Sequence, residues 1–343
     1  MGGDDAPNMI VGGIELACAH ADDVRYLLFG DEAQLNPLLD THPKAKAACE
    51  IRHTTDVVTM DDKPTSALRS GKNSSMRLAI DAVKNGEASA VVSAGNTGAL
   101  MAMATIVLRM LPGINRPAIV TSFPTQNGDC VMLDLGANIE CDAENLVQFA
   151  VMGEVFARYE LDIEQPSIGI LNVGVEGLKG NDSVKKAAAI LKESTLPIKF
   201  YGFVEGDDIG KGTVDVIVTD GFTGNIALKT AEGTAQLITF FLKKFLKGSL
   251  ISKIGALIAR PALERFRAHF DPRRYNGAML VGLNGVCVKS HGGTDALGFA
   301  HAIEAGVKLV RRNFNEVIKE DLGRLIAENS DKPDDKEPQS ATA

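Results

Sequence analysis

The sequence has no tryptophan, and only 5 % of its 343 residues are aromatic, whereas glycine is abundant with 34 residues. This composition is typical of an α/β enzyme with tight strand-to-helix turns and unlike an aromatic-rich all-β binding protein. The chain also lacks a basic excess, because 36 Lys and Arg face 44 Asp and Glu, a formal charge of −8. A nucleic-acid-binding protein usually carries a basic surface, so we expect no nucleic-acid partner. No run of 18 apolar residues occurs, and the sequence therefore predicts no membrane-spanning helix.

Several chemical signatures are missing as well. The five cysteines form no C-x-x-C pair, and no pair of Cys or His has the spacing of zinc ligands. No signal peptide is recognisable, so we expect a cytoplasmic protein with free thiols, no metal and no other cofactor. Neither nucleotide-binding motif (G-x-G-x-x-G after a strand, or G-x-x-x-x-G-K-[ST]) occurs, and the G-x-S-x-G nucleophile motif is absent.

Short apolar runs that end in glycine alternate with helical patterns along most of the chain. The runs are nearly continuous in apolar residues, as expected for strands that helices cover on both faces. Together they predict a three-layer αβα sandwich with a mostly parallel sheet. The predicted strands are Val24–Gly30, Ala88–Gly95, Ala118–Phe123, Cys130–Gly136, Ser167–Val173, Val214–Gly221 and Ala278–Lys289. The predicted helices are Ser74–Asn85, Thr97–Met110, Ala143–Tyr159, Asp182–Ser194 and Gly224–Lys247.

The ends of the chain differ from this pattern. Met1-Gly2-Gly3-Asp4 looks like the loop after a strand although no strand precedes it, and we expect a start assigned a few codons late or a shortened chain. Residues 328–343 are polar without an apolar period, which predicts a disordered tail. Residues 1–327 are then expected to form a single catalytic α/β unit.

Four predicted strands end in turns rich in glycine and asparagine. In open α/β sheets, ligands bind at the carboxyl ends of the strands. Glycine lets backbone approach a ligand, and the following helix N-terminus offers N–H groups to an anion. The turns therefore favour a phosphate-binding cleft, although Gly and Asn are also ordinary turn and cap residues. The four turns are Ser93–Gly98, Asp134–Asn138, Asn172–Asp182 and Asp220–Asn225.

Few charged residues accompany these turns. Lys179 and Lys229 lie in or just after the third and fourth turns, and Lys289-Ser290-His291 ends the last predicted strand. A lysine on a helix is commonly only solvated, and His291 caps a helix or donates to an anion. Asp134 and Asp220 either anchor their loops by accepting backbone N–H bonds or act in proton transfer. No side chain stands out as a nucleophile, and none is needed if phosphate itself attacks.

Residues 236–270 have a different character and predict an amphipathic helical hairpin. They contain seven basic residues and one acid, a charge of +6, which leaves −14 on the rest of the chain. Gly248 and Pro261 divide the segment into helical pieces. The apolar stripe between them consists of Leu250, Ile251, Ile254, Leu257 and Ile258, with Lys253 and Arg260 beside it. The hairpin packs in the core or in a dimer, binds a membrane interface, or attracts an acidic protein.

Long motifs spread over the chain to about residue 315 resemble those of the bacterial phosphate acyltransferases of phospholipid synthesis, the PlsX family. The segments with this resemblance are Met1-Gly2-Gly3-Asp4, Ser93–Leu100, Leu133–Asn138, Asn145–Gly153, Lys179-Gly180-Asn181, Val204-Glu205-Gly206, Asp220–Gly233, Asp271–Gly277 and Lys289–Gly292. This sequence differs from the usual pattern of the family in three places. Members usually have a short strand ending in Asp-Ala before the first motif, Gly292-Gly293-Thr294-Asp295 replaces Gly-Ser-Ser-Asp, and Val175 stands where an acid is common.

The resemblance implies an acyltransferase that moves a fatty acyl group from acyl-carrier protein to inorganic phosphate. It further implies a fold like isopropylmalate dehydrogenase and phosphotransacetylase, a homodimer, and a cytoplasmic enzyme peripherally associated with the membrane. A membrane acyltransferase that acylates glycerol 3-phosphate would use the product. The alternatives are a nicotinamide- and metal-dependent dehydrogenase of the same fold, and a non-catalytic scaffold at the membrane surface.

The site residues follow from the turns that match the family motifs. The residues expected to bind phosphate are Gly95, Asn96, Thr97, Gly98, Asn138, Lys179 and Asn181. The residues expected to act in catalysis are His291, Lys229, Asp220 and Asn225. His291 would donate to the phosphate or the thioester carbonyl, and Asp220 or Asp134 would handle a proton near the departing thiolate. The residues expected to contact the membrane or the carrier protein are Leu250, Lys253, Ile254, Leu257, Ile258 and Arg260.

Overall fold

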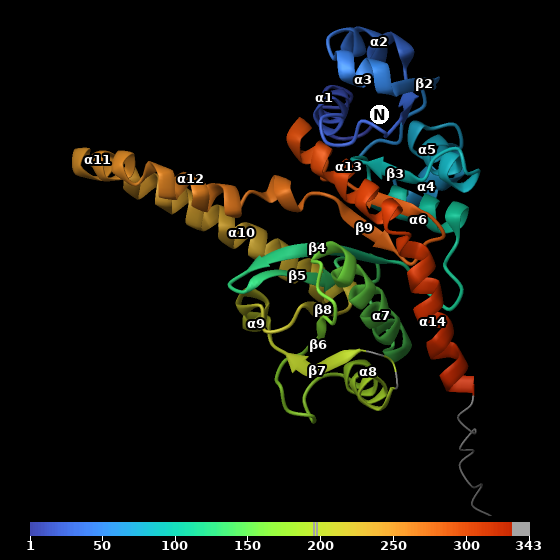
Figure 1. Ribbon diagram of the computed structural model, residues 1–343, viewed down its shortest axis with the longest axis vertical. Coiled ribbons are helices and arrows are strands. Elements are labelled where there is room, and N and C mark those ends of the chain that lie inside the picture. The colour runs from blue at the N-terminus through green and yellow to red at the C-terminus, as the bar shows by residue number, and fades with distance from the viewer. Residues whose placement is uncertain (195, 197, 331–343) are drawn as a thin grey trace, which may run out of the picture.

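A main sheet of eight strands and a separate parallel pair, β1–β2, form the framework of the computed structural model, which describes residues 1–194, 196 and 198–330 (Figure 1). The order in the main sheet is β3-β10-β9-β4-β5-β8-β6-β7. Four of its seven neighbouring pairs are parallel, and the three antiparallel pairs lie between β10 and β5. The strands are β1 (Tyr26–Gly30), β2 (Cys49–His53), β3 (Ala90–Ser93), β4 (Ala118–Thr125), β5 (Gly128–Leu133), β6 (Ser167–Leu171), β7 (Lys199–Val204), β8 (Val216–Val218), β9 (Ala278–Val281) and β10 (Val286–Lys289).

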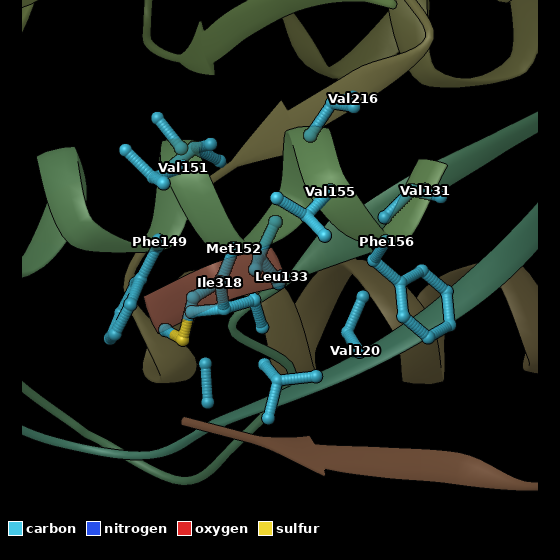
Figure 2. Close-up of a cluster of buried hydrophobic side chains, with 14 of the residues drawn as sticks. Val120, Val131, Leu133, Phe149, Val151, Met152, Val155, Phe156, Val216 and Ile318 are labelled. Carbon is cyan, nitrogen blue, oxygen red and sulfur yellow. The ribbon is translucent and has the colours of Figure 1, made fainter. Parts of the chain in front are cut away.

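Helices cover both faces of this sheet, and the alternation of apolar side chains explains why. In β5, Val131 and Leu133 belong to one buried cluster, whereas Cys130 and Met132 belong to another on the opposite face. Helices α7, α8, α13 and α14 contribute to the first cluster, and α4, α5, α6 and α10 contribute to the second. Figure 2 shows the first cluster, in which side chains of α7 such as Val155 lie against the strands. The predicted three-layer αβα sandwich with a mostly parallel sheet is therefore confirmed.

The helices in the described part of the chain are distributed along its whole length. They are α1 (Asn8–Ala17), α2 (Glu32–Asp40), α3 (Pro43–Ala48), α4 (Pro64–Ser70), α5 (Ser75–Lys84), α6 (Thr97–Leu108), α7 (Ala143–Glu160), α8 (Asp182–Glu193), α9 (Gly206–Lys211), α10 (Gly221–Leu246), α11 (Leu250–Ile258), α12 (Arg260–His269), the 3-10 helix η1 (Pro272–Tyr275), α13 (Ala296–Arg311) and α14 (Phe314–Ser330).

Short polar side chains set the starts of the five predicted helices. In α5, α6, α7, α8 and α10, the side chain of the preceding residue accepts a hydrogen bond from a backbone N–H of the first turn. Because Asp220 caps α10, this helix begins at Gly221 rather than at Gly224. The predicted turn Asp220–Asn225 is therefore wrong: it is the cap and first turn of α10. The capping residues are Ser74, Asn96, Asp142, Asn181 and Asp220.

The predicted strand Ala278–Lys289 is also wrong, because it is a hairpin of two antiparallel strands, β9 and β10. The reversal occurs between Val281 and Val286, where Gly282 has a φ of 92° that a larger residue rarely adopts. Apolar residues flank this turn on both sides and hide it within one apolar run. Lys289, Ser290 and His291 still follow the end of a strand, as expected, but that strand is β10.

The basic segment forms the expected hairpin outside the sheet layers. Helix α10 begins at the buried Gly221 and projects away from the sheet, α11 lies at the far end, and α12 returns to η1, which packs on α13 (Figure 1). The breaks lie at Lys247–Ser249 and at Ala259, beside the predicted Gly248 and Pro261. At the end of the described chain, α14 extends to Ser330. The predicted start of the tail at residue 328 therefore lies within this helix. Residues 331–343 of the predicted tail lie outside the described residues.

Candidate functional site

The first predicted phosphate-binding turn, Ser93–Gly98, joins β3 to α6 and is held by Asn96. The Asn96 side chain accepts the N–H of Ala99 at 3.0 Å and donates to the carbonyls of Met60 and Asp62 at 3.0 and 2.9 Å. This amide therefore anchors the segment before α4 to the start of α6. Gly95 is buried and Thr97 is exposed. What this turn offers a ligand is backbone N–H groups and the positive end of the α6 dipole.

The chain start and the end of β10 lie against this turn. The Gly2 backbone passes so close to Gly95 that a Cβ on Gly2 would lie 2.9 Å from the Gly95 Cα, which only glycine permits. The N–H of Asp4 donates to the carbonyl of Gly292 at 2.9 Å. The exposed His291 has its backbone N–H bonded to the Asn276 Oδ1 at 2.8 Å, and its Nδ1 accepts the N–H of Gly293 at 3.1 Å. The structure thus brings His291 next to the Gly95 turn.

Lys289, at this end of the sheet, was noted in the sequence as a charged residue after a predicted strand but was not assigned a role in the site. Its side chain is buried, and its ammonium donates to the carbonyl of Ser290. Burial lowers the pKa of Lys289 to about 8, and the Asp4 carboxylate acts in the opposite direction. Its position directly after the apolar run Val286–Val288, as the last residue of a buried strand, was the sequence signal that could have identified it.

The second predicted turn, Asp134–Asn138, is organised by a carboxylate with no solvent exposure. Asp134 accepts the backbone N–H groups of Ile119, Gly136, Ala137 and Asn138, and the Asn138 Nδ2, at 2.7–3.1 Å. Burial raises the pKa of the Asp134 carboxyl, and the hydrogen bonds from Ala137, Ile119 and Asn138 oppose the rise. Of the two roles predicted for Asp134, this geometry supports the loop anchor.

Asn138 is also engaged within the protein. Its Nδ2 donates to the carbonyl of Pro117 at 2.7 Å and to Asp134 at 2.9 Å, and its carbonyl accepts the N–H of Gly221 at 2.7 Å. The last contact joins this loop to the start of α10. Asp220 caps α10 by accepting the N–H and hydroxyl of Thr223 at 2.8 and 2.9 Å. The exposed Asn225 lies beside Gly136, so these three predicted residues share one neighbourhood.

The remaining predicted residues are on the surface. Lys179 and Asn181 lie in the exposed loop after β6, where the Asn181 Oδ1 accepts the N–H of Val184 at 2.9 Å and caps α8. Lys229 is exposed on α10 and pairs with Glu232 at 2.8 Å. No hydrogen bond or ion pair that the structure describes links Lys179 or Lys229 to the other predicted site residues.

The sheet topology divides the predicted turns between two strand directions. β5, β8 and β6 are parallel neighbours, so the turns at Asp134, Asp220 and Asn172 leave the same edge of the sheet. β3 and β10 run in the opposite sense, because three antiparallel pairs separate them from β5. The structure therefore groups Gly95, Asn96, Thr97, Gly98 and His291 in one place, and Asn138, Asp220 and Asn225 in another.

The cysteines do not have the properties of nucleophiles. Burial raises the pKa of Cys141 to about 12, and the carboxylates of Asp134 and Asp220 add to the rise. Burial also raises the pKa values of Cys49, Cys130 and Cys287 to about 12. A thiol needs a lowered pKa to react at neutral pH. Within residues 1–194, 196 and 198–330, no three His, Cys, Asp or Glu side chains are placed to hold a metal ion.

The end of the hairpin has exposed apolar side chains. On α11, Leu250, Leu257 and Ile258 are 78, 69 and 79 % exposed, and Ile254 is exposed as well. Lys253 is exposed on the same helix, and Arg260 pairs with Glu264 at 2.8 Å on α12. No helix in the described part of the chain is both long enough and apolar enough to cross a membrane.

The fold is that of the phosphotransacetylases. A phosphotransacetylase from Streptococcus pyogenes superposes with a TM-score of 0.59 over 88 % of this chain and 91 % of its own, at 18 % identity. A branched-chain phosphotransacylase from Enterococcus faecalis gives a TM-score of 0.55 over 90 and 96 % of the two chains, at 13 % identity. At these identities the likeness concerns the fold alone.

Sequence comparison then identifies the family. A family model described as "Fatty acid synthesis protein" matches residues 1–317. A phosphate acyltransferase of Rhodospirillum rubrum is 59 % identical over 95 % of this chain and 93 % of its own length. The corresponding protein of Rhodospirillum centenum is 60 % identical over 95 and 92 %. The chain belongs to this family, and the resemblance to the PlsX phosphate acyltransferases is confirmed.

Proposed function

We propose that the chain is an enzyme that transfers a fatty acyl group from acyl-acyl-carrier protein to inorganic phosphate, giving acyl phosphate for phospholipid synthesis. The main support is the identity of about 60 % with proteins named phosphate acyltransferase over nearly the full chain. In this reaction a phosphate oxygen attacks the thioester carbonyl, the C–S bond breaks, and the carrier thiolate takes a proton. No protein nucleophile is required, which agrees with the raised pKa values of four of the cysteines.

The first group of loops supplies the phosphate contacts that this reaction needs. In our proposal the backbone of Gly95–Gly98, with Thr97, binds phosphate, while Asn96 keeps this turn in place. His291 donates from Nε2 to the phosphate or to the oxygen of the thioester carbonyl, because its Nδ1 already accepts the Gly293 N–H. The proton of the attacking hydrogen phosphate passes to the departing thiolate, whereas Asp220, in the second group, caps α10 through Thr223.

On the side of the second group, we propose that four polar side chains form one wall of the binding site. They are Asn225 and Lys229 on α10, and Lys179 and Asn181 in the loop after β6. Asn138 supports this wall rather than binding phosphate, because its Nδ2 already has two acceptors. Asp134 anchors the loop in the same way.

The hairpin provides the proposed contacts with partners. Its basic residues suit an acidic carrier protein, and the exposed apolar side chains of α11 suit the membrane interface. The enzyme would then act in the cytoplasm at the inner face of the membrane, where the downstream glycerol-3-phosphate acyltransferase takes up the product. The exposed Phe240, Phe241 and Phe245 on α10 support a homodimer through the same helix.

The two alternatives have less support. The relatives do not favour a nicotinamide- and metal-dependent dehydrogenase, because they are named phosphate acyltransferases. A non-catalytic scaffold would explain the hairpin but not the two groups of polar loops.

The test of the proposed function is phosphate-dependent release of free carrier protein from an acyl-carrier-protein substrate. We expect release to require phosphate and to fall at least ~10-fold in His291→Gln, because one donor to the developing charge is removed. His20→Gln, which changes an exposed histidine paired with Glu304, is the matched control and should keep full turnover. Equal release with and without phosphate would contradict the proposal.

A further inference from the structure

Lys289 is a buried cation with too few partners. It is 8 % exposed and ends a strand whose preceding residues, Val286, Cys287 and Val288, are all buried. An ammonium has three N–H donors, and the described residues give it one hydrogen-bond acceptor, the carbonyl of Ser290. Burying an ammonium without hydrogen-bonded counter-charge is costly. Two of its N–H donors are therefore left without an acceptor among the described residues.

The charges around Lys289 do not satisfy this need. Its neighbours in the sheet, Ser93 on β3 and Ala278 on β9, are uncharged, and α6 has no charged residue. Asp4 on the N-terminal loop raises the pKa of Lys289 but makes no described salt bridge with it.

The other titratable groups at this end of the sheet are already engaged. Asp271 and Asp295 bind Arg273 at 2.5 and 2.9 Å, and the His291 Nδ1 accepts the N–H of Gly293. None of them is a described partner of Lys289.

Glycine backbones lie close together near Asp4, the acid that acts on Lys289. Gly2 lies against the Gly95 backbone, and Gly3 lies against the carbonyl oxygen of Gly292. Glycine lets backbone N–H groups approach a ligand closely. The α6 N-terminus, which begins at Thr97, and the donor at His291 border the same region.

We propose that Lys289 is the cation that binds inorganic phosphate, the acyl acceptor, in this protein. This inference rests on the proposed function and gives the role to a residue other than Lys179 and Lys229. Those two lysines are exposed, and Lys229 is already paired with Glu232. A buried ammonium attracts an anion more strongly than an exposed one, because water screens it less.

Steady-state kinetics of Lys289→Gln and Lys289→Arg test the inference. In Lys289→Gln we expect the KM for phosphate to rise at least ~10-fold while the KM for the acyl donor changes less than about 2-fold. Lys289→Arg should restore most of the phosphate affinity because it keeps the charge. Lys319→Gln, which removes a lysine paired with Glu316 on α14, is the matched control and should behave as the unaltered protein.

A pH profile separates a charge effect from a purely structural one. Since burial lowers the pKa of Lys289 to about 8, phosphate affinity of the unaltered protein should fall as the pH rises above 8. Arginine keeps its charge over this range, so Lys289→Arg should bind phosphate with an affinity that falls less between pH 7.5 and about 9.5. The ratio of the two proteins cancels the titration of phosphate itself.

The outcomes that overturn the inference are distinct from failure of the proposed function. An unchanged phosphate KM in Lys289→Gln, equal increases in both KM values, or identical pH profiles for the unaltered protein and Lys289→Arg would each overturn it. If Lys289→Gln does not fold, the pH comparison decides alone. If the unaltered protein shows no phosphate-dependent turnover, the proposed function fails, and calorimetric titration with inorganic phosphate decides whether Lys289 binds the anion.

Discussion

Replacement of Asp134 by alanine should destabilise the protein strongly, because this carboxylate binds five N–H donors with no exposure to solvent. Gly136 and Ala137 are near enough to the surface to be hydrated in the variant. The N–H groups of Ile119 and Asn138 are buried and would lose their acceptor. At roughly 1–3 kcal/mol for each unsatisfied buried donor, the free energy of unfolding should fall by about 2–6 kcal/mol.

Asp134→Asn should lower the free energy of unfolding by about half as much as Asp134→Ala. Its amide oxygen still accepts from Ile119, while its NH2 group faces the Asn138 N–H and cannot accept. Urea unfolding followed by circular dichroism measures both variants, and an unchanged dependence on urea would show that the folded state is retained. Asp207→Ala, which removes an exposed carboxylate paired with Lys211, should change the free energy of unfolding by less than about 0.5 kcal/mol.

Two results would refute this reasoning. A loss below about 1 kcal/mol in Asp134→Ala would mean that the hydrogen bonds do not hold the loop. If Asp134→Asn were as stable as the unaltered protein but lost its turnover and the acid limb of its pH profile, Asp134 would transfer a proton instead.

Further predictions concern α10 and α11. Gly224→Ala should lower the free energy of unfolding by about 3 kcal/mol or more, because its Cβ would lie 1.9 Å from the Asp134 carbonyl oxygen. Gly233→Ala is the control: its Cβ meets nothing within 4 Å, and it should raise the free energy of unfolding by about 0.5–1 kcal/mol. Thermal unfolding of both variants checks this, and equal melting temperatures would contradict it. Leu257→Glu should weaken sedimentation with anionic liposomes and leave turnover in solution unchanged, because it puts a charge on the exposed apolar end of the hairpin. Ile106→Glu, at an exposed apolar position of α6, is its control, and unchanged sedimentation of Leu257→Glu would make the hairpin a packing element.

The sequence was sufficient to predict most of the layered core, because apolar runs and capping residues are local signals. Six of the seven predicted strands and all five predicted helices are present, with starts set by residues such as Asn96 and Asp142. The error at Ala278–Lys289 arose because the turn at Gly282 lies within one apolar run. The elements that were not predicted are α1–α4, α9, α13, α14, β2 and β7. Short segments such as α9 and β2 lack a clear period.

The candidate site was predictable as a set of turns but not as an arrangement. The opposite directions of β3 and β5 depend on strand pairing between distant parts of the chain, which no local pattern encodes. The sequence also could not show that the side-chain amides of Asn96 and Asn138 already donate hydrogen bonds to backbone carbonyls. Lys289 was visible in the sequence, but its burial follows only from the packing of β10 between β3 and β9.

The most direct test of the central claim is the phosphate dependence of acyl transfer. Purified protein is incubated with a long-chain acyl-carrier protein, with and without inorganic phosphate, and both free carrier protein and acyl phosphate are quantified. We predict that the two products form in equal amounts and only when phosphate is present. Release of carrier protein without phosphate, or release with no acyl phosphate formed, would contradict the account.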